Sequence, residues 1–76
     1  VQGVIDCLLR DGDKLVIVDY KTDRVSAAAV PGRARSYYVQ VALYRRAVRE
    51  MFNVDEVEAY LVFLTPGVVV PVPEDS

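Results

Sequence analysis

Histidine is absent from the sequence, and cysteine occurs once. Without histidine, Ser-His-Asp catalysis, Cys-His catalysis and histidine-ligated zinc are excluded within these 76 residues. The single Cys7 excludes an internal disulfide and any four-cysteine metal or iron–sulfur site. No apolar run reaches the ~18 residues needed to span a bilayer, and no segment resembles a signal peptide. We therefore expect a cytoplasmic location.

Basic residues are absent from the last 27 positions, because all nine lysines and arginines lie in the first 49. The net charge of −2 argues against a chain that attracts nucleic acid with its whole surface. Any phosphate-binding surface must therefore belong to the first two thirds of the chain. The hydrophobic fraction of 53% is high for this length, which predicts a folded piece of a larger protein with apolar surface prone to self-association.

The central motif is residues 15–23, Leu-Val-Ile-Val-Asp-Tyr-Lys-Thr-Asp. Four apolar residues predict a strand, and the strand ends in an acid, an aromatic residue and a base. Alternate side chains of a strand lie on the same face, so Asp19 and Lys21 point the same way. The motif therefore predicts a carboxylate and an ammonium side by side at the end of a buried strand.

A second strand over 2–10 and a turn at Gly12 predict a β-hairpin with this motif. In the expected register Asp6 lies opposite Asp19, with Cβ atoms ~4.5–5.5 Å apart. The reverse face is almost wholly apolar and is expected to face the core. Its residues are Ile5, Cys7, Leu9, Val16, Val18 and Tyr20.

Two carboxylates opposed on one sheet face repel each other, and a divalent cation between them would relieve that repulsion. Mg²⁺ suits the position because it typically takes one or two carboxylates together with water and substrate phosphate. The alternative is an exposed hairpin end at which Lys21 offsets the charge of Asp6 and Asp19. A bulged three-residue turn would also break the register. The spacing alone leaves these interpretations open.

Residues 22–35 are expected to form a loop around Pro31-Gly32. The basic residues of this loop are Arg24, Arg33 and Arg35. Beside an acidic site these arginines would hold a phosphate backbone, and the alternative is a solvated loop.

Helical periodicity extends over 36–52, with Ser36 as the expected N-cap and Asn53 as the expected end. The apolar half of the helix contains Tyr37, Val41, Leu43, Tyr44, Ala47, Val48, Met51 and Phe52. The other half is expected to be a solvated face formed by Arg45, Arg46 and Arg49. Gln40 falls within the apolar arc, one turn before Tyr44, and a buried amide needs hydrogen-bond partners. A loop backbone, the metal site or a substrate phosphate would supply them.

Residues 57–64 are almost continuously apolar, which predicts a strand buried on both faces. Together with strand 15–21 and the helix, it predicts a βαβ crossover. A turn at 66–67 then leads into a short strand over 68–72, which Pro71 confines to an edge. The expected fold class is therefore α/β: a β-hairpin, a crossover helix and one or two further strands in a mixed sheet.

Three motifs follow one another along the chain, namely Gly3-Val4-Ile5-Asp6, Asp19-Tyr20-Lys21-Thr22-Asp23, and Gln40 with Tyr44. In this order and spacing they resemble the motifs of the RecB-type branch of the PD-(D/E)XK nucleases. Within this branch, the chain resembles the C-terminal nuclease domain of AddA-type helicase–nuclease subunits from Gly3 to about Val70. This resemblance implies a restriction-endonuclease-like core in which residues 1–76 lack an upstream helix and first strand. Such a partial domain is expected to be weakly active or inactive alone.

The resemblance also implies hydrolysis of DNA phosphodiesters with Mg²⁺ or Mn²⁺, by an exonuclease that processes double-strand ends for recombinational repair. The implied metal ligands are Asp6, Asp19 and the backbone carbonyl of Tyr20. Lys21 would position the attacking water or stabilise the charge that develops on the phosphate. Gln40 and Tyr44 match the motif that follows the lysine and would support the site or contact DNA.

The implied partners are DNA, the helicase domains of the same polypeptide and a partner nuclease subunit. ATP would act only through motor domains outside this chain. Two alternatives stay open. One is a non-catalytic nuclease-fold domain that binds DNA or another protein chain, although the presence of both acids and the lysine argues against it. The other is a stand-alone exonuclease of the same superfamily.

Overall fold

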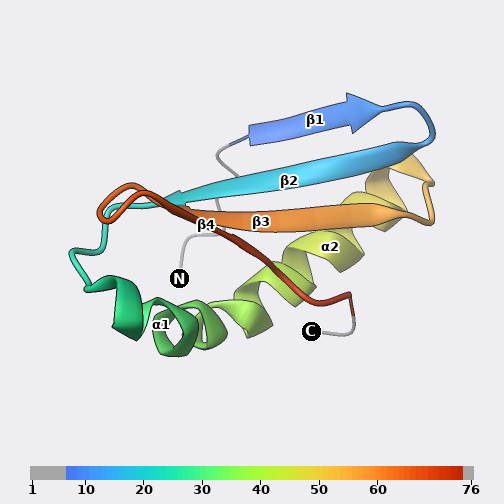
Figure 1. Cartoon of the computed structure of the whole chain (residues 1–76). Coiled ribbons are helices and arrows are strands. Elements are labelled where there is room, and N and C mark those ends of the chain that lie inside the picture. The colour runs from blue at the N-terminus through green and yellow to red at the C-terminus, as the bar shows by residue number, and fades with distance from the viewer. Residues whose placement is uncertain (1–6, 75–76) are drawn as a thin grey trace.

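The computed structural model of this protein describes residues 7–74, which form a four-stranded mixed sheet and a set of helices (Figure 1). The strand order in the sheet is β1-β2-β3-β4. The strands are β1 (Cys7–Asp11), β2 (Lys14–Lys21), β3 (Val57–Phe63) and β4 (Val68–Pro71). The helices are a 3₁₀ turn (Ala27–Ala29), α1 (Val30–Ser36) and α2 (Tyr38–Phe52). The expected α/β fold, with a hairpin, a crossover helix and two further strands, is confirmed.

Strands β1 and β2 form the predicted hairpin. Their antiparallel register runs from Cys7 opposite Val18 to Asp11 opposite Lys14, as expected from a tight turn. Gly12 has a φ of 62° in that turn, a conformation that glycine adopts without steric cost. The expected pairing of Asp6 with Asp19 lies outside the described residues.

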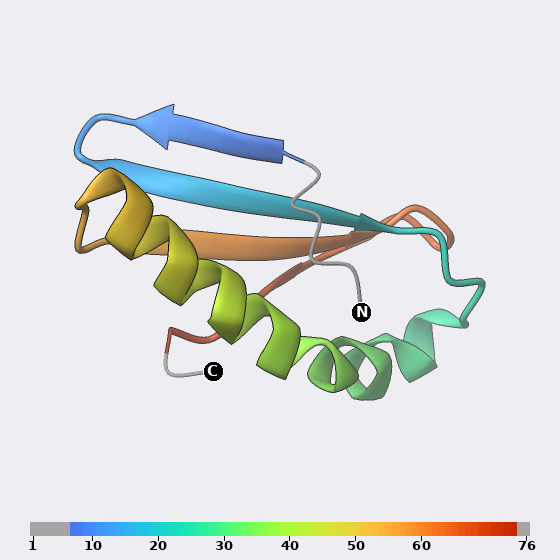
Figure 2. The same cartoon turned by 180° about the vertical axis from the view of Figure 1, so that it is seen from behind.

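Strands β2 and β3 are parallel, with Leu15 opposite Val57 and Lys21 opposite Phe63. Parallel neighbours require a long crossover, and α2 supplies it by lying across one face of the sheet (Figure 2). β4 returns antiparallel to β3 at the edge of the sheet, where Pro71 ends it. As a result, β2 and β3 both end at the side of the sheet where α1 begins (Figure 1).

The sheet face that was expected to line the core is the wrong one. The helices cover the opposite face, on which Leu15 and Ile17 are buried, whereas Val16 and Val18 are only half-buried and Tyr20 is 47% exposed. Both faces of β2 are apolar, so alternation alone did not decide between them. The core consists of Leu15, Ile17, Val30, Ala34, Val41, Tyr44, Val48, Val57, Ala59, Leu61, Phe63 and Val72.

Strand β3 shows the same asymmetry. Its burial alternates from Val57 to Phe63, with every second residue buried and the residues between them half-buried. The prediction of a strand buried on both faces therefore holds for one face and only in part for the other. The half-buried positions include Glu58 and Tyr60, whose polar ends reach the outer face of the sheet.

The segment expected as a loop over 22–35 is helical in its second half. Pro31 lies in the first turn of α1, where a missing N–H breaks no helical hydrogen bond and the fixed φ favours the helix. Ser36 ends α1 and does not cap α2, because its hydroxyl donates to the carbonyl of Arg33 at 2.6 Å. Tyr37 joins the two helices, and Asn53 ends α2 as predicted, in a left-handed conformation with a φ of 52°.

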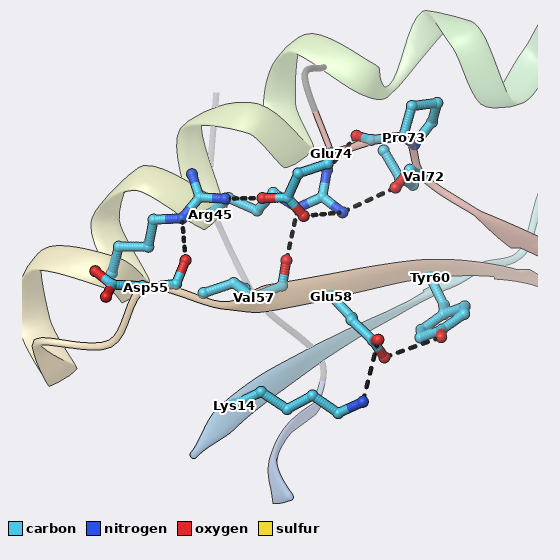
Figure 3. Close-up of polar contacts among 10 residues, drawn as sticks. Lys14, Arg45, Asp55, Val57, Glu58, Tyr60, Val72, Pro73 and Glu74 are labelled. Carbon is cyan, nitrogen blue, oxygen red and sulfur yellow. Dashed lines mark hydrogen bonds and ion pairs between the residues drawn. The ribbon is translucent and has the colours of Figure 1, made fainter.

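Arg45 does not belong to a solvated face, contrary to the prediction. The residue is 2% exposed, and its guanidinium donates to the carbonyls of Val57 at 3.1 Å and Val72 at 2.8 Å, and also to the carbonyl of Pro73 (Figure 3). The prediction of a solvated face rested on the charge of this residue. A helical wheel cannot show that backbone carbonyls of distant segments are available to bind a buried arginine. Parts of the expected apolar half are exposed in turn, namely Leu43, Met51 and Phe52.

None of the helices in the described part of the chain is long and apolar enough to cross a membrane.

Candidate active site

Asp19 and Lys21 lie at the carboxyl end of β2, on the face that α2 covers. The carboxyl ends of parallel strands are the usual place for ligand binding in open α/β sheets. The Nζ atom of Lys21 lies 3.0 Å from Oδ2 of Asp19. The side-by-side arrangement predicted from the alternation of the strand is therefore present.

Both members of this pair are removed from solvent. Asp19 is 3% exposed, and the side chain of Lys21 is 14% exposed. Desolvating a charge costs several kcal/mol, and a buried carboxylate persists only with a partner. Strand β2 therefore contributes Leu15 and Ile17 to the core and places the ion pair at the edge of that core.

Tyr37 approaches Lys21 from the junction between α1 and α2. The Nζ atom of Lys21 lies over the Tyr37 ring, 4.0 Å from the centroid, a contact that contributes roughly 0.5–2 kcal/mol. The Tyr37 hydroxyl donates to Oδ2 of Asp23 at 2.8 Å, and Arg33 lies 3.4 Å from the same oxygen. Burial and the hydrogen bond to Asp23 raise the pKa of the Tyr37 phenol above its ordinary value.

Sequence reasoning missed Tyr37 and Asp23 as members of this cluster. Tyr37 was placed only in the apolar arc of the helix, where its ring does lie close to that of Phe63, with centroids 6.5 Å apart. A signal was available, because a tyrosine at the start of an apolar arc brings a hydroxyl that needs a partner. Asp23, the last residue of the central motif, is the carboxylate that supplies this partner.

The three arginines assigned to phosphate binding follow Lys21 along one segment. Arg33 is the one that the ion pair with Asp23 joins to the cluster. Arg24 is exposed in the loop, and Arg35 is exposed on α1. Their contact with a phosphate backbone stays a prediction.

Gln40 and Tyr44 both lie on α2, one turn apart. Gln40 is half-buried in the first turn, and Tyr44 is buried in the core between the helix and the sheet. Gln40 was expected within the apolar arc, and its partial burial agrees with that placement. Whether either residue supports the site or contacts DNA stays a prediction.

The donor atoms at the strand end suit part of a hard-cation site. Mg²⁺ prefers oxygen ligands, and Asp19 supplies a carboxylate while Tyr20 supplies a backbone carbonyl. Asp6, the second expected carboxylate, lies outside the described residues. Between residues 7 and 74 no group of three or more acidic or cysteine side chains comes together that could hold a metal. Asp19 and Tyr20 therefore suit a cation whose remaining ligands would be water and substrate oxygens.

The whole chain, residues 1–76, matches the model of the PD-(D/E)XK nuclease superfamily. The chain belongs to this superfamily. The resemblance inferred from the three motifs is thereby confirmed, and the mixed sheet with its crossover helix agrees with the superfamily's fold.

Three relatives of this PD-(D/E)XK chain are named as subunits of an ATP-dependent helicase/nuclease. The protein from Anoxybacillus flavithermus is 42% identical over 99% of this chain, and that from Desulforudis audaxviator is 45% identical over 88%. The protein from Bacillus pumilus is 41% identical over 90% of this chain. The chain spans only 5% to 6% of the length of these relatives.

Proposed function

We propose that this chain is the core of a metal-dependent DNA exonuclease domain in a helicase–nuclease that processes double-strand ends for recombinational repair. The observation that carries the proposal is the buried pair of Asp19 and Lys21 at the carboxyl end of β2, in a chain of the PD-(D/E)XK superfamily. The name shared by the relatives, that of an ATP-dependent helicase/nuclease, supports the combination of a nuclease with a motor. A buried pair of this kind in a purely structural domain would add desolvation cost without adding function.

Asp19, the carbonyl of Tyr20 and Asp6 would hold Mg²⁺ or Mn²⁺. The ion supplies a water of lowered pKa and neutralises negative charge on the scissile phosphate. Asp19 is suited to this role because its carboxylate is held on a rigid strand and is almost completely buried. A fixed carboxylate needs little reorganisation when the ion binds.

Lys21 would act on the reacting phosphate itself. Its ammonium would donate to an oxygen of the phosphate as charge develops there, or would orient the attacking water. A charge in a site of low dielectric stabilises a developing anion much more strongly than the same charge in water. The small exposure of the Lys21 side chain meets this condition.

The arginines of the segment after β2 would hold the DNA backbone. Arginine binds phosphate through parallel hydrogen bonds, and each neutralised phosphate makes binding more sensitive to salt. Gln40 and Tyr44, on the helix above the sheet, would support the site. The remaining partners are the helicase domains of the same polypeptide and a second nuclease subunit, with ATP acting through the motor. The setting would be the cytoplasm.

Calorimetric titration with Mg²⁺ and Mn²⁺ tests the metal site on this chain. We expect binding that is lost in Asp19→Ala and in Asp6→Ala and is retained in Asp13→Ala, which removes an exposed carboxylate at the far end of the hairpin. Binding that persists in Asp19→Ala would contradict the proposal.

A second experiment tests the reaction in the helicase–nuclease polypeptide that carries this domain. With end-labelled linear DNA, we expect release of labelled nucleotides that depends on the divalent ion and on Asp19. Metal binding without any DNA cleavage would favour the non-catalytic alternative.

A further inference from the structure

Tyr37 is fixed in space more firmly than the lysine it contacts. Its backbone N–H donates to the carbonyl of Ala34 at 3.0 Å, and its own carbonyl accepts from Val41 at 3.0 Å, so both helices hold it. Its ring lies beside Phe63 of β3, and its hydroxyl donates to Asp23. The side chain is therefore anchored at both ends, with its ring face turned toward Lys21.

Lys21 by contrast has a long and flexible side chain. An ammonium on a four-carbon stem loses much rotamer freedom when it is held in one place, so a catalytic lysine needs contacts that define its position. Within the described residues, the Lys21 ammonium has two such contacts: an ion pair with Asp19 at 3.0 Å and the Tyr37 ring, whose centroid is 4.0 Å away. Both restrain the same Nζ atom.

These two contacts differ in what happens when the site is used. Asp19 carries oxygens that a divalent cation would also take, and the cation and the ammonium repel each other. The ion pair is therefore weakened in the loaded site. The ring of Tyr37 has no such competitor and continues to attract the ammonium.

We propose that Tyr37 is a positioning residue that holds the Lys21 ammonium at the reacting phosphate while Asp19 is engaged elsewhere. This inference rests on the proposed nuclease function. The ring face positions the lysine, and the hydroxyl anchors the ring to Asp23, which Arg33 in turn holds by an ion pair. A series of contacts from Arg33 through Asp23 and Tyr37 thus reaches Lys21. It links the segment proposed to bind the DNA backbone to the lysine proposed to act on the phosphate.

Lysine-selective ¹³C labelling tests the contact directly, because the sequence contains only two lysines, Lys14 and Lys21. Protons above an aromatic ring are shifted upfield, so the side-chain methylene signals of Lys21 are expected upfield of those of Lys14. Tyr37→Phe retains the shift because the ring remains, whereas Tyr37→Leu abolishes it. The shift is expected to persist when Mg²⁺ is added.

Tyr38→Leu is the matched control. Tyr38 is the neighbouring tyrosine, and it lines a groove on the outer side of α2 with Val39 and Leu43. This variant loses the same chemical group one position away, so the Lys21 signals are expected to stay in place. Lys14 lies beside Glu58 and serves as an internal reference in every spectrum.

Kinetics in the helicase–nuclease polypeptide test the consequence. Misplacing a reacting group by about 1 Å costs on the order of 100-fold in rate, so Tyr37→Leu is expected to lower kcat about 10- to 100-fold with KM unchanged. Tyr37→Phe is expected to restore most of kcat, which a loss of general stability would not predict.

Two results would overturn the proposal. One is a Lys21 signal that Tyr37→Leu leaves unchanged, and the other is a shifted signal without any loss of kcat. A parent protein that cleaves no DNA would instead overturn the proposed nuclease function. In that case the lysine spectra still decide whether Tyr37 holds Lys21.

Discussion

Helix α2 carries two polar clusters built on opposite principles. At its N-terminal end, the ring of Tyr37 contacts Lys21 and the hydroxyl of Tyr37 donates to Asp23, so the contacts join side chains. At its midpoint, Arg45 is buried and donates to backbone carbonyls of β3 and of the segment after β4 (Figure 3). The first cluster contains groups for which the proposed metal ion would compete, and the second joins an arginine to backbone carbonyls.

Because of this difference, we expect the Lys21 cluster to matter mainly for function and the Arg45 cluster mainly for stability. A backbone carbonyl keeps its place as long as the strand does, so Arg45 fixes the end of the sheet permanently against the helix. A carboxylate such as Asp19, if it binds a metal ion as proposed, would exchange the Lys21 ammonium for that ion, so the cluster around Lys21 would be adaptable. Substitutions in the two clusters are therefore expected to affect different measurements.

The largest effect on stability is expected for Arg45→Met. The substitution keeps an unbranched side chain of moderate size but leaves three carbonyls without their donor, at a cost of about 3 kcal/mol or more. Urea unfolding of the chain measures this cost. Arg46→Met, in the next residue on the exposed side of the helix, is expected to stay within about 0.5 kcal/mol. Equal unfolding free energies for the two variants would mean that the hydrogen bonds of Arg45 do not stabilise the fold.

Lys21→Arg is expected to show the opposite behaviour. The positive charge beside Asp19 is retained, so folding is largely preserved, but the planar guanidinium places its donors elsewhere. We expect nuclease activity to fall about 100-fold or more, as when a donor to a developing anion is removed. The control is Lys14→Arg, which changes the other lysine and is expected to leave the rate unchanged. Full activity of Lys21→Arg would show that charge without position suffices.

The strand that carries Asp19 and Lys21 was largely predictable from sequence, whereas Tyr37 and Asp23 were missed as members of the first cluster. The turn at Gly12 fixed the hairpin register, and the alternation along β2 placed Asp19 and Lys21 on one face. The length between the two apolar strands required a crossover helix. These predictions depend on local geometry, which a short stretch of sequence determines.

The elements of the second cluster were not predictable in the same way. The partners of Arg45 are carbonyls from residues 57, 72 and 73, which no pattern within the helix reveals. The choice between two apolar faces of β2 also depended on how the helices pack. The helix α1 was missed because Pro31-Gly32 suggests a turn, although proline is well tolerated in a first helical turn.

Glu74 tests whether the second cluster owes its strength to backbone acceptors. Its carboxylate forms ion pairs with Arg49 and, at 3.8 Å, with Arg45, but it is exposed. Glu74→Gln is expected to cost only about 0.2–1 kcal/mol in urea unfolding, and the cost is expected to vanish at high salt. The cost of Arg45→Met is expected to persist at high salt. If salt reduced the cost of both substitutions equally, the stability lost in Arg45→Met would come from its ion pair with Glu74 and not from its bonds to backbone carbonyls.

The smallest effect is expected on the outer face of the sheet, where Lys14 lies 3.1 Å from Glu58. The hydrogen bond from Lys14, followed by one from Tyr60, lowers the pKa of the Glu58 carboxyl below 4.5. A lowered folded-state pKa contributes stability above the unfolded value of 4.5, and this stability is lost as the pH falls through the folded-state pKa.

Lys14→Met is therefore expected to lower the thermal midpoint slightly at neutral pH. The difference from the parent chain should shrink as the solution is acidified below pH 4.5, because Glu58 becomes protonated in both proteins. Thermal unfolding across this pH range measures the difference. Because the contact joins two side chains at the surface, salt should also reduce it, as for Glu74 and unlike Arg45. A difference that grew on acidification would mean that Lys14 acts through another partner.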